Sequence, residues 1–194
     1  MITLMQLLIH AIQFGFGLLA GLFLLRLLLQ LSRANFYNPI SQAVYQATRL
    51  PIDALTRVLP PVGRFNTASL VLALGCQWLA IALTLLVVGA EVPALRWLVW
   101  GVLGTAALLV NFYFYGIFAI VILSWIAPQA NHPAAALLWQ LVDPALAPAR
   151  RLIPSLGGLD LSPMLVLFGL GAVRILLHNL AAATGLIGGA VPGL

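Results

Sequence analysis

The sequence predicts an all-α membrane protein whose four transmembrane helices form two repeats of one shared orientation. Three observations support this fold class. Of the 194 residues, 63% are hydrophobic and only 7% are charged, whereas a soluble domain carries about a quarter charged residues. Four apolar segments are each long enough to cross a bilayer, which takes about 20 residues. The second half of the chain also repeats the pattern of the first.

The first repeat is predicted over residues 1–92. It contains an apolar helix over 4–31, a polar stretch over 32–65 and an apolar helix over 67–88. In the polar stretch, Asn38-Pro39 starts a short helix, Pro51 breaks it, and Pro60-Pro61 end a second short piece. These pieces are too short to span and have a periodic apolar face. The pattern therefore predicts amphipathic helices in the membrane interface.

The second repeat is predicted over residues 93–194. It contains an apolar helix over 94–126, an amphipathic stretch over 128–162, an apolar helix over 163–180 and a glycine-rich apolar tail. Gly157 and Gly158 predict a sharp turn. Ser162-Pro163 then predicts a helix start capped by the serine hydroxyl. The tail is either a short membrane-associated end or a frayed one, and the sequence leaves both alternatives open.

The two repeats coincide in one register when the first is shifted by 94 residues. The coinciding pairs are Pro39 with Pro133, Tyr45 with Trp139, Gln46 with Gln140, Arg57 with Arg151, Pro60 with Pro154, Gly63 with Gly157, and Gly75 with Gly169. Each unit has an even number of spans, so both units share one orientation. This is a parallel repeat, related by a pseudo-twofold axis along the membrane normal.

The arginines predict which side faces the cytoplasm. The two polar stretches and their edges hold Arg26, Arg33, Arg49, Arg57, Arg64, Arg150 and Arg151, whereas the opposite side holds only Arg96. The positive-inside rule places both polar stretches in the cytoplasm and both termini outside. The net charge of +5 is too sparse for a nucleic-acid surface. We therefore expect membrane lipids as partners and no binding of nucleic acid.

One run in the second repeat resembles the signature of the YggT family of bacterial membrane proteins. It consists of Asp143-Pro144, Pro148, Arg150-Arg151, Pro154, Gly157-Gly158, Asp160 and Ser162-Pro163, with Ser124-Trp125 upstream. The resemblance covers nearly the whole chain. In the first copy, Leu50 stands at the proline of D-P and Thr56 replaces the first arginine.

The resemblance implies a multi-pass protein of the bacterial inner membrane. The YggT family is similar to plastid and cyanobacterial proteins linked to the assembly of membrane complexes. Bacterial members are connected with osmotic and ion homeostasis and with division-related gene neighbourhoods. No enzymatic activity is settled for the family. The resemblance therefore implies other membrane proteins as partners and a role in osmotic or envelope homeostasis.

Five charged residues of the polar stretches are candidates for binding lipid or a partner: Arg57, Asp143, Arg150, Arg151 and Asp160. The arginines either bind lipid phosphate or an acidic partner segment, or only set the topology, and both interpretations stay open. A catalytic pair of Asp143 and Asp160 is the weaker hypothesis. Asp143 is expected to cap or to pair with a nearby arginine, and Asp160 to stabilise the start of the last helix.

A second candidate set lies inside the membrane: His10, Gln13, Asn111, Arg174 and His178. Arg174 lies deep in the last span, where a charge costs at least ~2.5 kcal/mol. Two hypotheses follow. The set lines an ion or proton path, or Arg174 is a structural charge whose acceptors are Gln13, Gln77 or Asn111 and freed backbone carbonyls. The second hypothesis is favoured because the spans contain no carboxylate.

These patterns lead to two hypotheses about function. Three scattered histidines and a single cysteine make no metal site, and neither a phosphate loop nor a nucleophile elbow occurs, so we expect no enzyme and no cofactor. The first hypothesis is a non-catalytic inner-membrane protein that organises or assists membrane protein complexes. The alternative is an ion or osmolyte channel or transporter component with a polar path near Arg174, which requires a homo-oligomer to form a pore.

Overall fold

The computed structural model describes residues 2–126, 132–152, 160–186 and 190–194. The described residues form the helices α1 (Ile2–Leu31), α2 (Pro39–Thr56), α3 (Thr67–Val88), α4 (Ala94–Ile126), α5 (Pro133–Leu152) and α6 (Ser162–Ala183). Four of them, α1, α3, α4 and α6, are long and apolar enough to cross a membrane. The predicted all-α class with four spans is confirmed. The predicted turn at Gly157-Gly158 lies outside the described residues.

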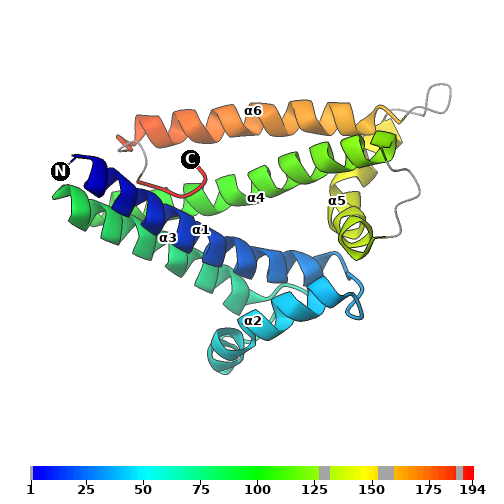
Figure 1. Ribbon diagram of the computed structural model, residues 1–194, viewed down its shortest axis with the longest axis horizontal. Helices are drawn as coiled ribbons and strands as arrows, with labels where there is room; N and C mark the ends of the chain where they lie inside the picture. The colour runs from blue at the N-terminus through cyan, green and yellow to red at the C-terminus, as the bar shows by residue number, and fades with distance from the viewer. Residues whose placement is uncertain (1, 127–131, 153–159, 187–189) are drawn as a thin grey trace.

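The spans form two helical hairpins, α1 with α3 and α4 with α6, which are joined where α3 packs on α4. Figure 1 shows that α2 and α5 lie at the same end of the molecule, while the N-terminus lies at the other end and the C-terminus lies beside the middle of α4. We call the former the α2/α5 end. Each repeat therefore has the order of span, amphipathic helix and span. This arrangement agrees with two repeats that share one orientation.

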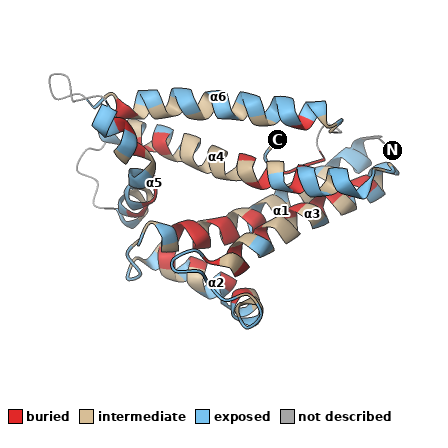
Figure 2. Ribbon diagram, turned by 180° about the vertical axis from the view of Figure 1, so that it is seen from behind, coloured by how far each residue is buried: buried red, intermediate tan, exposed pale blue. Residues whose placement is uncertain are grey.

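The apolar faces of α2 and α5 pack against the spans. Val44 of α2 lies in one buried cluster with Leu28 of α1 and Leu141 of α5. Leu146 of α5 is buried against Ile117 of α4. The sequence predicts helices that lie on the membrane, but an amphipathic period cannot distinguish a lipid surface from a protein surface. Here the buried face contacts protein (Figure 2).

The prediction that Pro51 ends a helix is wrong. Helix α2 continues through Pro51 to Thr56, and an ion pair of 3.3 Å between Arg49 and Asp53 spans the proline. Proline removes one helical hydrogen bond at a cost of about 3 kcal/mol. Burial of Thr48 and Ile52 on either side of it offsets that cost. The proline bends the helix instead, and α2 changes direction along its length (Figure 1).

Helix α6 does not start as the sequence predicts. Ser162 is buried as the first residue of α6, and its Oγ has no hydrogen-bond partner among the described residues. The backbone N–H of Ser162 instead donates to Oδ1 of Asp160 at 2.9 Å. At the corresponding place in the first repeat, Asn66 accepts the N–H of Ser69 at 2.9 Å. Both repeats thus use the same position for the acceptor, and Asp160 stabilises the start of α6 as predicted.

The 190–194 segment folds back into the bundle, which was neither of the predicted alternatives. Val191 is only 2% exposed. The side chain of Gln77 donates to the carbonyl of Pro192 at 3.1 Å, and that of Asn111 donates to the carbonyl of Gly193 at 3.0 Å. Two amides from different spans therefore hold the backbone of this segment against α3 and α4.

Candidate functional site

A cluster of three charged residues joins α5 to the start of α6. The guanidinium of Arg150 donates to Oδ1 of Asp143 through Nη1 and to Oδ2 of Asp160 through Nε at 3.2 Å. Asp143 and Arg150 lie two turns apart on α5, so their side chains meet on one face. The predicted pairing of Asp143 with a nearby arginine is confirmed.

The cluster shifts the pKa values of two of its members. The hydrogen bond with Asp143 raises the pKa of Arg150 despite some burial, and the bond with Asp160 adds to this effect. Burial alone would raise the pKa of Asp160, but hydrogen bonds from the backbone N–H of Ser162 and from Arg150 hold the pKa below the ordinary value. All three side chains are more than a third exposed. Such pairs stabilise a protein by about 0–1 kcal/mol, so we interpret the cluster as a joint between two helices.

The two arginines of the Arg150-Arg151 pair lie in different surroundings. Arg150 faces two carboxylates, whereas Arg151 is exposed in the last turn of α5. Arg57, its counterpart in the first repeat, is exposed at the C-cap of α2. Arg151 and Arg57 therefore have the same exposed place in both repeats, while the position of Arg150 is held by Thr56 in the first repeat.

Arg174 lies near the middle of α6 and is half-buried. It follows Ser162 by 12 residues in a helix of 22 residues, so it lies about 18 Å along the helix. Its guanidinium carbon lies 4.7 Å from the ring centre of Phe114 and 5.3 Å from that of Tyr115. Its Nη2 donates to the hydroxyl of Tyr115 at 3.3 Å. Two aromatic residues of α4 thus hold the charge within the membrane-spanning region.

The predicted acceptors of Arg174 are wrong. The side chains of Asn111 and Gln77 bind carbonyls of the 190–194 segment, and Gln13 donates to Thr84 Oγ1 at 3.1 Å. The 190–194 segment therefore engages two of the three amides that were predicted to bind Arg174. The run of aromatic residues over 112–115 was the available signal, because aromatic faces attract guanidinium groups.

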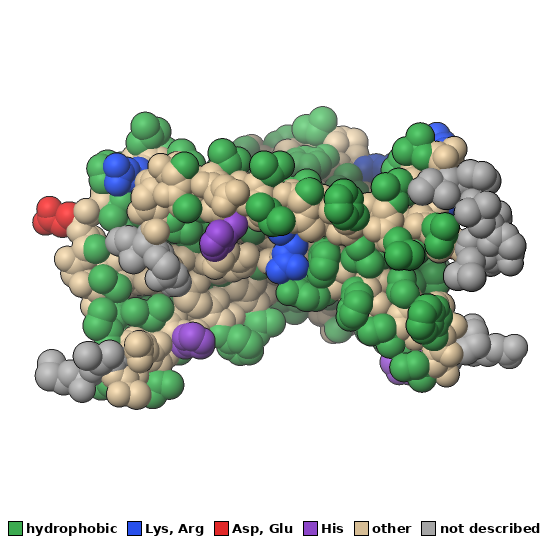
Figure 3. Space-filling view, turned by 90° about the horizontal axis from the view of Figure 1, so that it is seen from above, with side chains coloured by type: hydrophobic (Ala, Val, Ile, Leu, Met, Phe, Trp, Pro, Cys, Tyr) green, Lys and Arg blue, Asp and Glu red, His purple; other side chains and the backbone are tan. Residues whose placement is uncertain are grey.

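Arg174 lines a cavity of about 400 Å³ between α4, α6 and the 190–194 segment. The other polar residues of this lining are Asn111, His178 and Asn179. Figure 3 shows the α6 face, where a basic side chain lies midway along the molecule among hydrophobic ones. Three of the five polar residues that the sequence singled out within the membrane therefore lie together.

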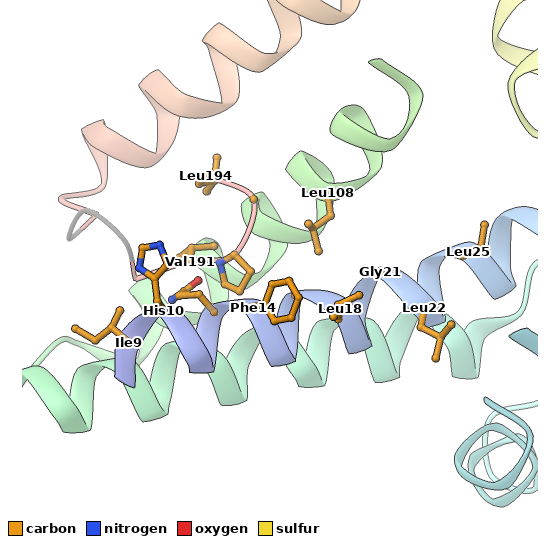
Figure 4. A pocket seen from close by; sticks show the side chains of 14 residues that line it. Ile9, His10, Phe14, Leu18, Gly21, Leu22, Leu25, Leu108, Val191 and Leu194 are labelled. Atoms are coloured by element: carbon orange, nitrogen blue, oxygen red, sulfur yellow. The ribbon is translucent and has the colours of Figure 1, made fainter. Parts of the chain in front are cut away.

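The other two, His10 and Gln13, line a different cavity of about 750 Å³ along α1. Most of its lining is apolar. Figure 4 shows Phe14 and Leu18 on α1 and Leu194 across the cavity from that helix. Gly193 and Leu194 line both cavities. The 190–194 segment thus lies between the two cavities, and the five polar residues form two groups.

The family model of CCB3/YggT proteins matches residues 5–87 and 99–181. The chain belongs to the CCB3/YggT family. The second matched segment begins and ends 94 residues after the first, which is the shift at which the sequence repeats. The match includes Arg174 and Arg150 but ends before the 190–194 segment.

The chain is similar along most of its length to several proteins that carry no assigned function in their names. YggT of Escherichia coli is 35% identical over 164 residues, which are 84% of each chain. The uncharacterized protein PA0392 of Pseudomonas aeruginosa is 40% identical over 166 residues, again 84% of each chain. No solved structure matches. Together with the four candidate spans, these similarities define a multi-pass membrane protein of the YggT family.

Proposed function

We propose that this YggT-family protein is a non-catalytic protein of the bacterial inner membrane that organises or assists membrane protein complexes. We further propose that its docking site is the cavity around Arg174, and that the docked element is a transmembrane helix with a carboxylate near its middle. One observation carries the proposal. Arg174 lies deep within a span with a single neutral oxygen as its hydrogen-bond acceptor among the described residues.

The charge of Arg174 requires more acceptors than its surroundings offer. A guanidinium has five N–H donors, and the hydroxyl of Tyr115 takes one of them at the long distance of 3.3 Å. The ring faces of Phe114 and Tyr115 lower the cost of the charge but cannot accept the remaining donors in geometry typical of hydrogen bonds. A charged acceptor from outside would pair with this group.

The acceptor is expected to come from a different protein. Residues 2–31, 67–88, 94–126 and 162–183 contain neither aspartate nor glutamate, so the spans of a second copy offer no carboxylate side chain either. A transmembrane helix with a carboxylate at mid-depth has the complementary charge. Burial in the membrane would make such a pair stronger than a pair at the surface.

The shape of the site supports a helix as the occupant. Ala107 and Gly171 are small residues in the lining of the Arg174 cavity, and small residues allow two membrane helices to approach closely. Helix α6 buries only Ser162 and Ala181 among its own residues, so most of its surface is free to face lipid or a partner (Figure 2).

The arrangement favours docking over conduction. On α6, the lining of the Arg174 cavity begins at Gly171, which is more than two turns from Ser162 at the α2/α5 end. His10 and Gln13 lie on the far side of the 190–194 segment. The non-catalytic part of the proposal rests on Asp143 and Asp160, whose carboxylates bind Arg150 at an exposed surface. The role in osmotic or envelope homeostasis is an expectation from the family resemblance.

Site-specific crosslinking in intact membranes tests the proposal. A photoreactive residue at Leu177, which lines the cavity, should crosslink a protein whose contacting transmembrane helix contains an aspartate or glutamate. Arg174→Leu should abolish this crosslink, while Arg174→Lys should retain part of it because the positive charge remains. Replacing the partner carboxylate with its amide should have the same effect as Arg174→Leu.

Two results would overturn the proposal. A crosslink of equal yield in the wild type and in Arg174→Leu would show that the charge does not recruit the partner. An ion or osmolyte flux in liposomes that contain only this protein, lost in Arg174→Leu, would support the transport hypothesis instead.

A further inference from the structure

A small polar pocket lies at the α2/α5 end, apart from the Arg174 cavity. Its volume is about 230 Å³, below the roughly 300–1,000 Å³ of sites for drug-sized ligands. It is formed by the end of α1, the connection to α2 and the first turns of α2. Its polar and aromatic lining consists of Arg26, Gln30, Arg33, Phe36, Ser41 and Tyr45.

Two buried polar groups in this lining have unused hydrogen-bonding capacity. Arg26 is only 7% exposed, and its Nε has no partner among the described residues. Ser41 is 4% exposed, and its Oγ likewise has no partner there. Buried polar groups are normally hydrogen-bonded, and a buried charge is normally paired. Both groups therefore point to an acceptor that is supplied from outside the chain.

The surroundings of Arg26 provide orientation but no negative charge. Its guanidinium carbon lies 3.8 Å from the ring centre of Tyr45, and Tyr45 packs edge-to-face on Phe36. No aspartate or glutamate is part of the described lining. Asp53, the one acidic residue of α2, pairs with Arg49 at 3.3 Å. The aromatic pair thus fixes the plane of a guanidinium that has no carboxylate in direct contact among the described residues.

The second repeat shows that the fold does not require this arginine. At the shift of 94 residues, Arg26 corresponds to Ile120, which is 1% exposed in α4. Ser41 corresponds to Ala135 of α5. The same structural position can therefore be filled by apolar side chains. Arg26 and Ser41 are therefore polar residues that only the first repeat has at these two positions, as expected where a site binds a ligand.

The chemistry of the lining identifies the class of ligand. A planar guanidinium pairs with the oxygens of a phosphate through parallel hydrogen bonds. Arg33, which is exposed, adds a second cation, and Ser41 adds a hydroxyl donor. Arg26 lies five residues before the end of α1 at Leu31, which places it about 7.5 Å from that end. This is the expected depth of lipid headgroups.

We propose that this pocket binds a phosphate group, carried either by the headgroup of an anionic phospholipid or by free phosphate. The juxtaposition of Arg26, Arg33 and Ser41 around one pocket is the observation on which the proposal rests. It is independent of the docking proposed at Arg174, because the two sites share no residue.

The protein in nanodiscs of neutral phosphatidylcholine provides the test. In one arm, phosphatidylglycerol is titrated in and the bound lipid is counted by native mass spectrometry. In the other arm, inorganic phosphate is added and the thermal unfolding midpoint is measured. The variants are Arg26→Ile and Ser41→Ala. Each introduces the residue found at the corresponding position of the second repeat, Ile120 or Ala135. Arg64→Gln is the control, since Arg64 is exposed at the same end and lies outside the pocket.

We expect the wild type and Arg64→Gln to bind one anionic ligand at this site with equal affinity. Arg26→Ile should weaken binding by about 10- to 150-fold, the range that a charge-assisted hydrogen bond supplies. Saturation by phosphatidylglycerol alone identifies the lipid as the source, and a shift produced by inorganic phosphate identifies the free anion. Ser41→Ala should weaken binding less, because it removes a neutral donor.

The proposal fails if neither anion binds the wild type better than phosphatidylcholine does, or if Arg26→Ile binds as well as Arg64→Gln. Ile120 in the second repeat indicates that Arg26→Ile folds. If its unfolding midpoint without ligand nevertheless falls far below that of the wild type, Arg33→Gln replaces it. Unchanged binding in Arg33→Gln and Ser41→Ala together would then reject the site.

Discussion

A methyl group at Gly104 is predicted to force the 190–194 segment out of its place. A Cβ built on Gly104 would lie 2.4 Å from Cγ1 of Val191 and 3.1 Å from the side-chain amide of Gln77. Val191 is a stiff, buried side chain, so it cannot turn away without moving its backbone. The hydrogen bond from Gln77 to the carbonyl of Pro192 is next to this contact, so it would break when the backbone of Val191 moves.

The expected size of the effect follows from these contacts. Overpacking a core costs about 1–3 kcal/mol. If the segment leaves instead, the bonds to Pro192 and Gly193 are lost at about 0.5–1.5 kcal/mol each. Both routes predict that Gly104→Ala lowers the free energy of unfolding by roughly 1–3 kcal/mol. Hydrogen exchange in the peptide that contains residues 190–194 should also become faster.

The matched control is Gly75→Ala, in α3. A Cβ on Gly75 meets nothing within 4 Å, and alanine is favoured over glycine inside a helix by about 0.5–1 kcal/mol. This variant should be as stable as the wild type or slightly more stable, with unchanged exchange at 190–194. Equal stability and equal exchange for Gly104→Ala and Gly75→Ala would refute the packing argument.

Three further predictions concern other contacts. Thr184→Val leaves the Nε1–H of buried Trp100 without its 2.8 Å acceptor, so the free energy of unfolding in detergent should fall by about 1–3 kcal/mol; an unchanged value would contradict this. Because the pKa of Asp160 is lowered, its contribution to stability is complete above the ordinary value of 3.8 and is lost as the pH falls below that value. The free energy of unfolding of the wild type, measured against pH, should therefore fall in this range, and that of Asp160→Asn should not show this fall. Arg174→Leu should leave thermal stability in detergent equal or higher, because the loss of one long hydrogen bond and two ring contacts is offset by removing a charge from the membrane. A large decrease would show that Arg174 is a structural charge.

The spans and the repeat could be predicted from the sequence because both depend on local features. Hydropathy alone defines a segment that can cross a membrane, so helix α4 was predicted over its observed bounds, Ala94–Ile126. The repeat was visible because prolines, glycines and arginines coincide at one shift. The pairing of Asp143 with Arg150 was also accessible, since both residues lie on one face of one helix.

The remaining features depend on contacts between distant segments. Pro51 was predicted to end a helix because the low helix propensity of proline can be read from the sequence alone. The burial of Thr48 and Ile52 on each side of it depends on contacts with other helices, which the sequence does not show. Arg26 was counted only as a topological charge. Its burial depends on Tyr45, which a different helix supplies. The 190–194 segment looked like an end because its partners, Gln77 and Asn111, lie in other spans.

The departure from twofold symmetry accounts for the position of the intramembrane cavities. In a closed pair of parallel repeats, the packing of α3 on α4 would recur between α6 and α1. The former contact is present, but the 190–194 segment occupies the region between α1 and the α4/α6 hairpin (Figure 1). A short segment fills less space than a helical contact, so it leaves one cavity on each of its sides. His10 and Arg174, which line these two cavities, are thereby accessible from the membrane, whereas Gln77 on the closed side is fully buried.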